Sequence, residues 1–337
     1  MGERSERRVA VVGCGAVTER FYRPALEESD LDGDEVVFVD TDVERAKRMA
    51  DGLAGASVAE THEAVTSEVD GAIIAVPHEF HHPLALDFIS DGAHVLVEKP
   101  LAVTGEQATE LVRAAAEAGV EIAVNNTRRL FPTTERIRSL VGSGELGALT
   151  RIHVEEGNDF SWPTSSGFYF TSDEPKGVVL DWGPHVFDQI CWWTGEQPTL
   201  RSSRDDSRGG SEAVATIDFE VGERASGHVR LSWLSRLANV WYVGFENGHV
   251  VARPDDWETL EITRLGETEH VTVESEYDTY YDFGRPVVQN FVDVLNGDAS
   301  PLVPGESVVD SIEFIDRCYA ARESFELPWL SPRAGSP

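Results

Sequence analysis

Basic residues are scarce in this chain of 337 residues, and lysine is almost missing. Only 28 residues are basic against 60 acidic ones, so the formal net charge is −32, and the lysines are limited to Lys47, Lys99 and Lys176. Proteins that bind nucleic acid need basic patches, so we expect no nucleic-acid partner. Because like charges repel in a compact state unless salt screens them, we expect a protein of a halophile that needs high salt. The alternative is an acidic protein that binds a basic partner.

Cysteine and long apolar runs are scarce as well. The three cysteines, Cys14, Cys191 and Cys318, stand far apart and form no C-x-x-C pair, which argues against a disulfide framework. No apolar run approaches the roughly 20 residues of a membrane span, and the charged residues 1–8 do not look like a signal peptide. We therefore expect a reduced, cytoplasmic protein without a membrane partner, long enough for two domains with separate cores.

The first half alternates short apolar runs, rich in β-branched residues, with amphipathic stretches. We expect strands at residues 9–12, 36–39, 70–76, 94–97 and 121–124, and helices at 19–28, 42–51, 83–91 and 105–118. This alternation predicts an α/β fold with a parallel, doubly wound (Rossmann) sheet, whose ligand lies at the carboxyl ends of the strands. In chain order these ends carry Gly13, Asp40, Pro77-His78, Glu98-Lys99-Pro100 and Asn125-Asn126.

A glycine-rich turn follows the first strand. Residues 13–18 keep the first two glycines of the dinucleotide fingerprint, which allow the tight turn and the approach of the pyrophosphate, but Thr18 replaces the third. The residues expected to bind a dinucleotide here are Gly13, Gly15, Ala16 and Val17. Asp40 ends the second strand, where a carboxylate hydrogen-bonds the adenosine ribose and repels a 2′-phosphate, so NAD is favoured over NADP. The alternative is that Asp40 caps the helix at 42–51.

Two further motifs lie near strand ends of this half. The run His78-Glu79-Phe80-His81-His82 could suggest a metal site, but no cysteine or carboxylate completes a convincing ligand set nearby. We expect a loop that lines the cofactor and no metal. Lys99, between Glu98 and Pro100, ends a strand in a chain that has nearly eliminated lysine. We expect it to serve chemistry, and the alternative is a solvated surface lysine.

The second half is richer in strand-like runs. After a helix-like stretch at 133–141, we expect strands at 149–155, 213–220, 225–234, 240–245 and 270–274. Long strands with few helices between them predict an α+β domain with one open, mainly antiparallel sheet. The expected division is residues 1–128 for the nucleotide-binding domain and 129–337 for the second domain.

One stretch of the second half carries a carboxylate and an imidazole four residues apart. These are Asp181 and His185, within residues 177–185. If the segment is helical, both side chains lie on one face, one turn apart. An Asp and a His held in this way can share one small substrate, one as base and the other orienting a hydroxyl.

Together these motifs resemble the glucose–fructose oxidoreductase / inositol dehydrogenase family of NAD(P)-dependent enzymes. The matching pieces are Gly13-Cys14-Gly15, Pro77-x-x-x-His81, Glu98-Lys99-Pro100, Arg128-Arg129 and Gly177-x-x-x-Asp181-x-x-x-His185. The resemblance covers nearly the whole chain and departs at Thr18, at His78, where members usually carry asparagine, and at Lys176, where they carry glycine. It implies subunit pairing through the second sheet, so we expect a homodimer or homotetramer. With the strand ends, it assigns cofactor contacts to Pro77, His78, His81, Glu98, Lys99 and Asn126.

The resemblance implies reversible hydride transfer between nicotinamide and a hydroxyl carbon of a sugar, polyol or nucleotide sugar. We expect His185 to act as the base and cationic Lys99 to stabilise the developing alkoxide and favour the neutral imidazole. Asp181 would hold the substrate hydroxyl or the Lys99 ammonium. Aromatic side chains mixed with amide and hydroxyl groups after residue 157 fit a sugar-binding wall as well as a satellite core. The expected substrate contacts are Arg128, Asn158, Trp162 and Tyr169.

Three alternatives stay open. The first is an NAD-dependent glycosidase that oxidises, eliminates and re-reduces its substrate with the same residues. The second is a regulator of the same fold that senses NAD or sugar without catalysis, against which the presence of Lys99, Asp181 and His185 argues. The third is a nucleotide-sugar 3-dehydrogenase, which differs only in its substrate.

Overall fold

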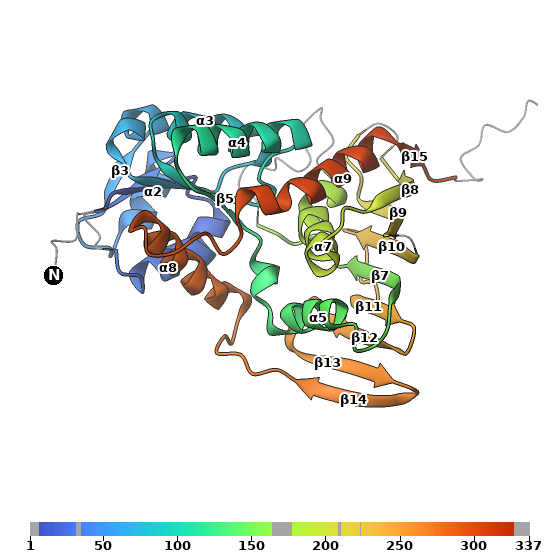
Figure 1. Ribbon diagram of the computed structural model, residues 1–337. Helices are drawn as coiled ribbons and strands as arrows, with labels where there is room; N and C mark the ends of the chain where they lie inside the picture. The colour runs from blue at the N-terminus through green and yellow to red at the C-terminus, as the bar shows by residue number, and fades with distance from the viewer. Residues whose placement is uncertain (1–6, 32–34, 164–176, 208–209, 223, 327–337) are drawn as a thin grey trace, which may run out of the picture.

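The computed structural model describes residues 7–31, 35–163, 177–207, 210–222 and 224–326. These residues form two sheets that lie beside each other, with helix α7 (Val178–Thr194) between them (Figure 1). No helix in the described ranges is long and apolar enough to cross a membrane.

The first sheet is the predicted Rossmann sheet. Its six parallel strands run in the order β3-β2-β1-β4-β5-β6. Both faces are covered, so β1, β2 and β4 are buried at every residue, as their continuous apolar runs predict. The strand bounds are β1 Val9–Val12, β2 Val36–Val39, β3 Ser57–Ala59, β4 Gly71–Ile74, β5 His94–Glu98 and β6 Ile122–Asn125.

Helices connect these strands largely where the sequence predicts them. They are α2 (Val43–Ala50), α3 (His81–Ser90) and α4 (Gly105–Ala118). The expected helix at 19–28 is divided into a π-helical turn, η1 (Thr18–Tyr22), and α1 (Arg23–Glu27). Pro24 lies in the first turn of α1, where its missing N–H costs no hydrogen bond.

The second sheet has nine strands in the order β14-β13-β12-β11-β7-β10-β9-β8-β15. Most neighbours are antiparallel, as predicted, whereas β7 pairs with β10, and β8 with β15, in parallel. Five strands of the two sheets, β3, β8, β12, β13 and β15, were not expected. The strand bounds are β7 Leu149–Gly157, β8 Thr199–Asp205, β9 Val214–Val221, β10 Ala225–Ser232, β11 Val240–Phe245, β12 Gly248–Arg253, β13 Asp256–Arg264, β14 Glu267–Thr272 and β15 Arg322–Ser324.

Helix α7 packs on the inner face of this sheet, together with α5 (Pro132–Ser143) and α9 (Val309–Ala320). The strand β9 alternates buried and half-buried side chains, so one face is apolar. Phe219 on that face meets Phe187 of α7 and Phe314 of α9, whose rings are 4.8 Å apart, centre to centre. This aromatic cluster fixes α7 against the sheet.

The last third of the chain returns to the first sheet. Helix α8 (Gly284–Leu295) packs beside α1, and Phe291 and Leu295 fill the space next to Gly71, where an added Cβ would lie 2.7 Å from Leu295. The N–H of Val124 in β6 donates to the carbonyl of Val303 at 2.9 Å. Helix α9 packs against α4, which covers the first sheet, and against β8 of the second sheet, so it joins the two sheets.

Candidate functional site

A cavity of about 1010 Å³ lies between the carboxyl ends of the first sheet and the start of α7. Pockets for drug-sized ligands measure roughly 300–1,000 Å³, so this one has room for a dinucleotide and a small substrate. Most of the predicted site residues line it. They are Gly13, Gly15, Ala16, Val17, Asp40, Pro77, His78, His81, Glu98, Lys99, Arg128, Asn158, Trp162, Asp181 and His185. Tyr169 and Lys176 lie outside the described residues.

The glycine turn after β1 is shaped for close approach. Gly13 has a φ of +94°, and a Cβ there would lie 2.3 Å from the Ala75 carbonyl oxygen, so only glycine fits. Gly15 faces open space in the cavity. Thr18 is fully buried and its hydroxyl donates to the Gly13 carbonyl at 2.5 Å. The threonine that replaces the third glycine therefore ties the turn to the helix that follows.

Asp40 joins this turn to the end of β2. Its carboxylate accepts the N–H of Cys14 and the N–H of Asp42, both at 2.8 Å, and pairs with Arg45 at 3.1 Å. The alternative that Asp40 caps the next helix is wrong, because Asp42 is the N-cap of α2 and accepts from the N–H of Glu44. Asp40 thus lines the cavity at the end of β2.

His81 and Glu98 brace the cavity wall. The His81 ring nitrogens lie 2.6 Å from the Pro100 carbonyl and 2.9 Å from the Val76 carbonyl, so both already face backbone oxygens. Burial lowers the pKa of His81. The Glu98 carboxyl bonds the Tyr22 hydroxyl and the Asn125 amide, each at 2.7 Å, and burial raises its pKa. These contacts hold strand ends together rather than offering a free polar atom to a ligand.

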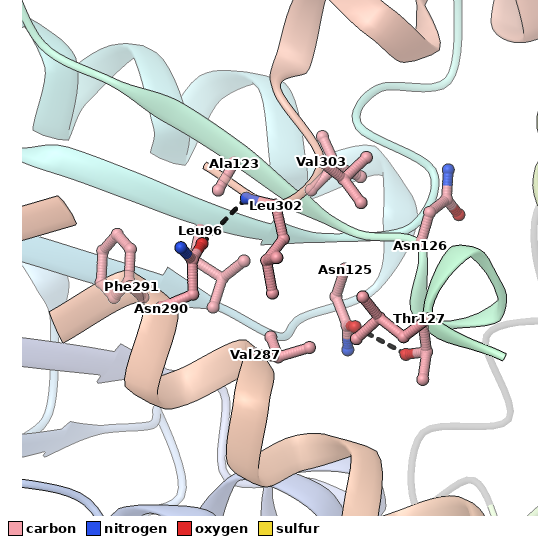
Figure 2. A pocket seen from close by; sticks show the side chains of 12 residues that line it. Leu96, Ala123, Asn125, Asn126, Thr127, Val287, Asn290, Phe291, Leu302 and Val303 are labelled. Carbon is pink, nitrogen blue, oxygen red and sulfur yellow. Dashed lines mark hydrogen bonds between the residues drawn. The ribbon is translucent and has the colours of Figure 1, made fainter. Parts of the chain in front are cut away.

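The two asparagines at the end of β6 point in different directions (Figure 2). Both line a small pocket of about 10 Å³, but only Asn125 also lines the large cavity. Asn126, the residue chosen from the sequence, hydrogen-bonds Asp188 instead. That pocket has room for one water at most. The position predicted for Asn126 is therefore occupied by Asn125.

The histidine run does not assemble a metal site in the described part of the chain, where no three His, Cys, Asp or Glu side chains converge. His82 leaves the cavity and meets Glu110 of α4 at 2.9 Å. His78 is buried and lines the cavity.

Lys99 and Asp181 meet across the two halves of the molecule. The Lys99 Nζ donates to Asp181 Oδ1 at 2.8 Å and to the Asp181 carbonyl at 2.9 Å, although 82 residues separate them. Both side chains are largely buried, at 16% and 9% exposure. The end of β5 is therefore tied to the first turn of α7 by a charge-assisted hydrogen bond, the stronger kind.

His185 lies one turn further along α7 and faces the same cavity. It is buried, and its Nδ1 has no hydrogen-bond partner among the described residues. Burial, together with the positive charges of Arg128 and Lys99, holds the pKa of His185 well below its usual value. The imidazole is thus neutral at neutral pH and able to accept a proton.

Arg128 reaches the cavity wall in a fixed position. Its guanidinium binds both carboxylate oxygens of Glu156, at 2.8 and 2.9 Å, and lies over the Trp241 ring. Trp241 also donates its indole N–H to Glu156 at 2.7 Å. The neighbouring Arg129 points away and pairs with Asp188 of α7.

The aromatic stretch after β7 packs on the core and also reaches the cavity. Phe160 packs on Trp233, with ring centres 5.0 Å apart, and so belongs to the core, yet it lines the cavity beside Asn158 and Trp162. The guanidinium of Arg20 stands over the Trp162 ring at 5.9 Å.

Glu212 is a residue of the site that the sequence does not reveal. Its carbonyl accepts the N–H of Val178, and its carboxylate accepts the N–H of Val179 and the Tyr319 hydroxyl, all at 2.9 Å. A Cβ at Gly177 would lie 2.1 Å from the Glu212 carbonyl oxygen, which explains this glycine. Burial raises the pKa of Glu212 to about 7. No local pattern could have found it, because it caps a helix that starts 34 residues earlier in the chain.

Two family models match this chain. The model of the oxidoreductase family with an NAD-binding Rossmann fold, GFO_IDH_MocA, matches residues 7–126, and that of the GFO/IDH/MocA C-terminal domain matches residues 134–251.

Curated relatives agree with these models. The rhizopine catabolism protein MocA of Rhizobium meliloti is 32% identical over 200 residues, which cover 57% of this chain and 58% of that protein. Inositol 2-dehydrogenase 4 of Saccharopolyspora erythraea is 32% identical over 207 residues, 59% of this chain and 57% of its own length. The matches therefore span less than two thirds of these relatives. D-xylose 1-dehydrogenase (NADP⁺) 2 of Haloferax volcanii is 24% identical, over 93% of this chain and 97% of its own.

Solved structures share the fold. The 3-ketoreductase KijD10 of Actinomadura kijaniata, in complex with NADP and TDP-benzene, superposes with a TM-score of 0.81 at 18% identity, covering 96% of this chain and 100% of that one. An oxidoreductase of Agrobacterium radiobacter, in complex with NAD⁺, L-tartaric acid and magnesium, gives 0.78 at 17% identity, over 94% and 96%.

Proposed function

This chain belongs to the Gfo/Idh/MocA family of oxidoreductases, and on that premise we propose that it transfers hydride reversibly between a nicotinamide dinucleotide and a hydroxyl carbon of a sugar or polyol. The observation that carries the proposal is the contact of Lys99 from the Rossmann sheet with Asp181 of α7, in a cavity that His185 also lines. An ammonium, a carboxylate and a neutral imidazole thereby line the same cavity as the glycine turn after β1.

The residues present fit a dinucleotide. Gly13 and Gly15 leave the turn after β1 without side chains, so a pyrophosphate can approach the backbone. Asp40 lines the cavity at the end of β2, where its carboxylate suits ribose hydroxyls and repels a 2′-phosphate. We therefore propose NAD as the preferred cofactor, which when bound supplies the hydride acceptor.

The chain's own residues supply the proton chemistry. His185, held neutral, takes the proton from the substrate hydroxyl. The Lys99 ammonium, which Asp181 orients, donates to the oxygen on which negative charge develops. Arg128, Asn158 and Trp162 line the same cavity and are the proposed substrate contacts, with Tyr169 as a further one from the sequence.

The proposal is tested with two single substitutions. We expect Lys99→Ala and His185→Ala each to lower kcat by about 10²–10⁴, because each removes a group that acts in proton transfer, while NAD still binds. Turnover is followed by the absorbance of reduced nicotinamide with a panel of sugars and polyols at high salt, and NAD binding by calorimetry. Lys47→Ala is the matched control, since Lys47 is exposed on α2 and forms a surface ion pair with Glu44, away from the cavity lining.

Near-normal turnover in Lys99→Ala or His185→Ala would contradict these roles. Release of a sugar from a glycoside without net formation of NADH would instead favour the glycosidase. NAD or sugar binding without any turnover in the wild-type protein would favour the regulator.

We also propose a homo-oligomer, a dimer or a tetramer, that works in a reducing, salt-rich cytoplasm. The buried, unpaired state of Cys14, Cys191 and Cys318 supports the reducing compartment. The net charge of −32 supports the salt requirement.

A further inference from the structure

We propose that the substrate is an uncharged sugar or polyol, and that the pairing of Arg128 with Glu156 disfavours sugar acids and nucleotide sugars. The inference rests on the proposed function and deepens it. It follows from the charges on the substrate wall, the part of the cavity next to α7, whose ionised side chains are Lys99, Arg128, Asp159 and Asp181 and whose imidazole is that of His185.

Both cations of the substrate wall already have a carboxylate partner. Lys99 lies 2.8 Å from Asp181, and Arg128 lies 2.8 and 2.9 Å from the two oxygens of Glu156. The imidazole of His185 is buried in the same wall, and its burial together with the charges of these cations keeps it neutral. Asp159 is exposed at the entrance and adds a negative charge. Among the described residues, the wall therefore offers an anion no unpaired positive charge.

The Arg128 pair cannot easily open to serve a substrate anion. The Glu156 side chain is 4% exposed, and it also accepts the indole N–H of Trp241. Leaving a buried carboxylate without its partner is strongly destabilising. A new hydrogen bond to a charged group contributes less than that. The pair of Arg128 with Glu156 is therefore favoured over a new pair with the substrate. A carboxylate or diphosphate bound at the substrate wall would lose its hydration without forming an ion pair.

The cation nearest to the rim does not change this balance. Arg20 is exposed, stands over the Trp162 ring and approaches the Tyr281 hydroxyl at 3.4 Å, outside the cavity lining. It supports the outer side of an aromatic ring whose other side can take the apolar face of a sugar. Asn158 and Ser161 supply amide and hydroxyl groups beside that ring. An uncharged polyol matches these groups.

The first test uses substrates that differ only in charge. Wild-type protein with NAD at high salt is given glucose, glucuronate and UDP-glucose, the corresponding galactose series, and myo-inositol. We expect kcat/KM to be at least about tenfold higher for the best neutral compound than for any charged one, since a tenfold change is about 1.4 kcal/mol. A charged compound as the best substrate overturns this inference and leaves the proposed function intact. If the protein binds NAD but turns over none of these compounds, both this inference and the proposed function are overturned.

The second test unpairs Arg128. Glu156→Gln keeps an oxygen acceptor for Trp241 but removes the charge that neutralises Arg128, so the ratio of kcat/KM for the acid to that for the neutral sugar should rise at least about tenfold. Glu155→Gln is the matched control, because Glu155 lies next to Glu156 in β7, points to the other face of the sheet and pairs with His153. An unchanged ratio in folded Glu156→Gln overturns the role of the pair.

A surface substitution keeps the inference testable if Glu156→Gln does not fold. Asp159→Lys, at an exposed position, places a cation on the substrate wall without opening a buried pair. The same ratio should rise several-fold and fall again as salt is added, because the new charge is screened. No change in the ratio at the lowest salt that keeps the protein folded counts against the charge argument.

Discussion

The proposed role of His185 as the base rests on the position of its side chain in the fold. Its ring is buried, and Arg128 and Lys99 both face the same cavity, so protonation would add a third positive charge without water to solvate it. The Nδ1 atom of this ring has no hydrogen-bond partner among the described residues. A free histidine is half protonated near pH 6.5. His185 instead stays unprotonated at that pH, so its ring nitrogen is available to a proton.

This predicts the acid limb of the pH–rate profile. With a neutral substrate, kcat/KM should stay on its plateau down through pH 6.5 and fall only at lower pH, since the depressed pKa of His185 controls the free enzyme. Stability should begin to fall earlier, below pH 6.5, because the unfolded chain then binds a proton that the folded protein does not. An acid limb centred at or above pH 6.5 would contradict the assignment of His185.

At the scale of elements, α7 is the part on which the site depends. Its N-terminus has no capping side chain of its own, and Glu212 supplies both a carbonyl and a carboxylate to the first two N–H groups. Asp181 and His185 lie in the first two turns after this cap. The orientation of the helix start therefore decides where the carboxylate meets Lys99.

We expect Glu212→Gln to change how stability depends on pH. The folded protein holds a proton on Glu212 up to about pH 7, whereas the unfolded carboxyl releases it near 4.5, so stability should fall as pH rises between these values. The full difference is on the order of 3 kcal/mol. Glutamine does not titrate, so the stability of Glu212→Gln relative to wild type should improve from pH 5 to pH 8, measured by denaturant unfolding. Glu258→Gln, at an exposed site, is the control. If stability depends on pH in the same way in wild type, Glu212→Gln and Glu258→Gln, the prediction is wrong.

At the scale of the whole molecule, two kinds of charge behave differently. Buried pairs such as Arg129 with Asp188 lie where salt hardly reaches, at 6% and 2% exposure. Many other pairs are exposed, for example Lys47 with Glu44, and contribute little. The acidic excess lies mostly on the surface, where its repulsion acts against both sheets and the helices that join them.

We therefore expect stability to rise with salt. The Debye length falls from about 10 Å at 0.1 M to about 3 Å at 1 M, so the Tm should increase over this range of KCl and increase little beyond it. Sucrose at matched osmolality is the control, since it strengthens burial without screening charge. A Tm that is already maximal at 0.1 M KCl without ligand would contradict the halophilic interpretation.

The elements predicted well are those whose pattern is local. The helix at 105–118 was placed correctly because Thr104 caps it, an apolar stripe runs along it and Gly119 ends it in a left-handed conformation. The strands β12 and β13 were missed although both carry apolar residues, because their place in the sheet is set by pairing with neighbouring strands and not by a local pattern. The expected division at residue 128 stays a prediction, and α8 and η8 (Gly305–Val308) pack against the first sheet.

The sequence by itself determined the Rossmann alternation, the edge at which ligand-facing residues gather, and the helical spacing of Asp181 and His185, because each depends on backbone periods of a few residues. Only the tertiary structure decided that Asn125 rather than Asn126 lines the cavity, that Glu212 caps α7, and that Glu156 neutralises Arg128. Those contacts join residues far apart in the chain, and their partners are selected by burial, which no local pattern encodes.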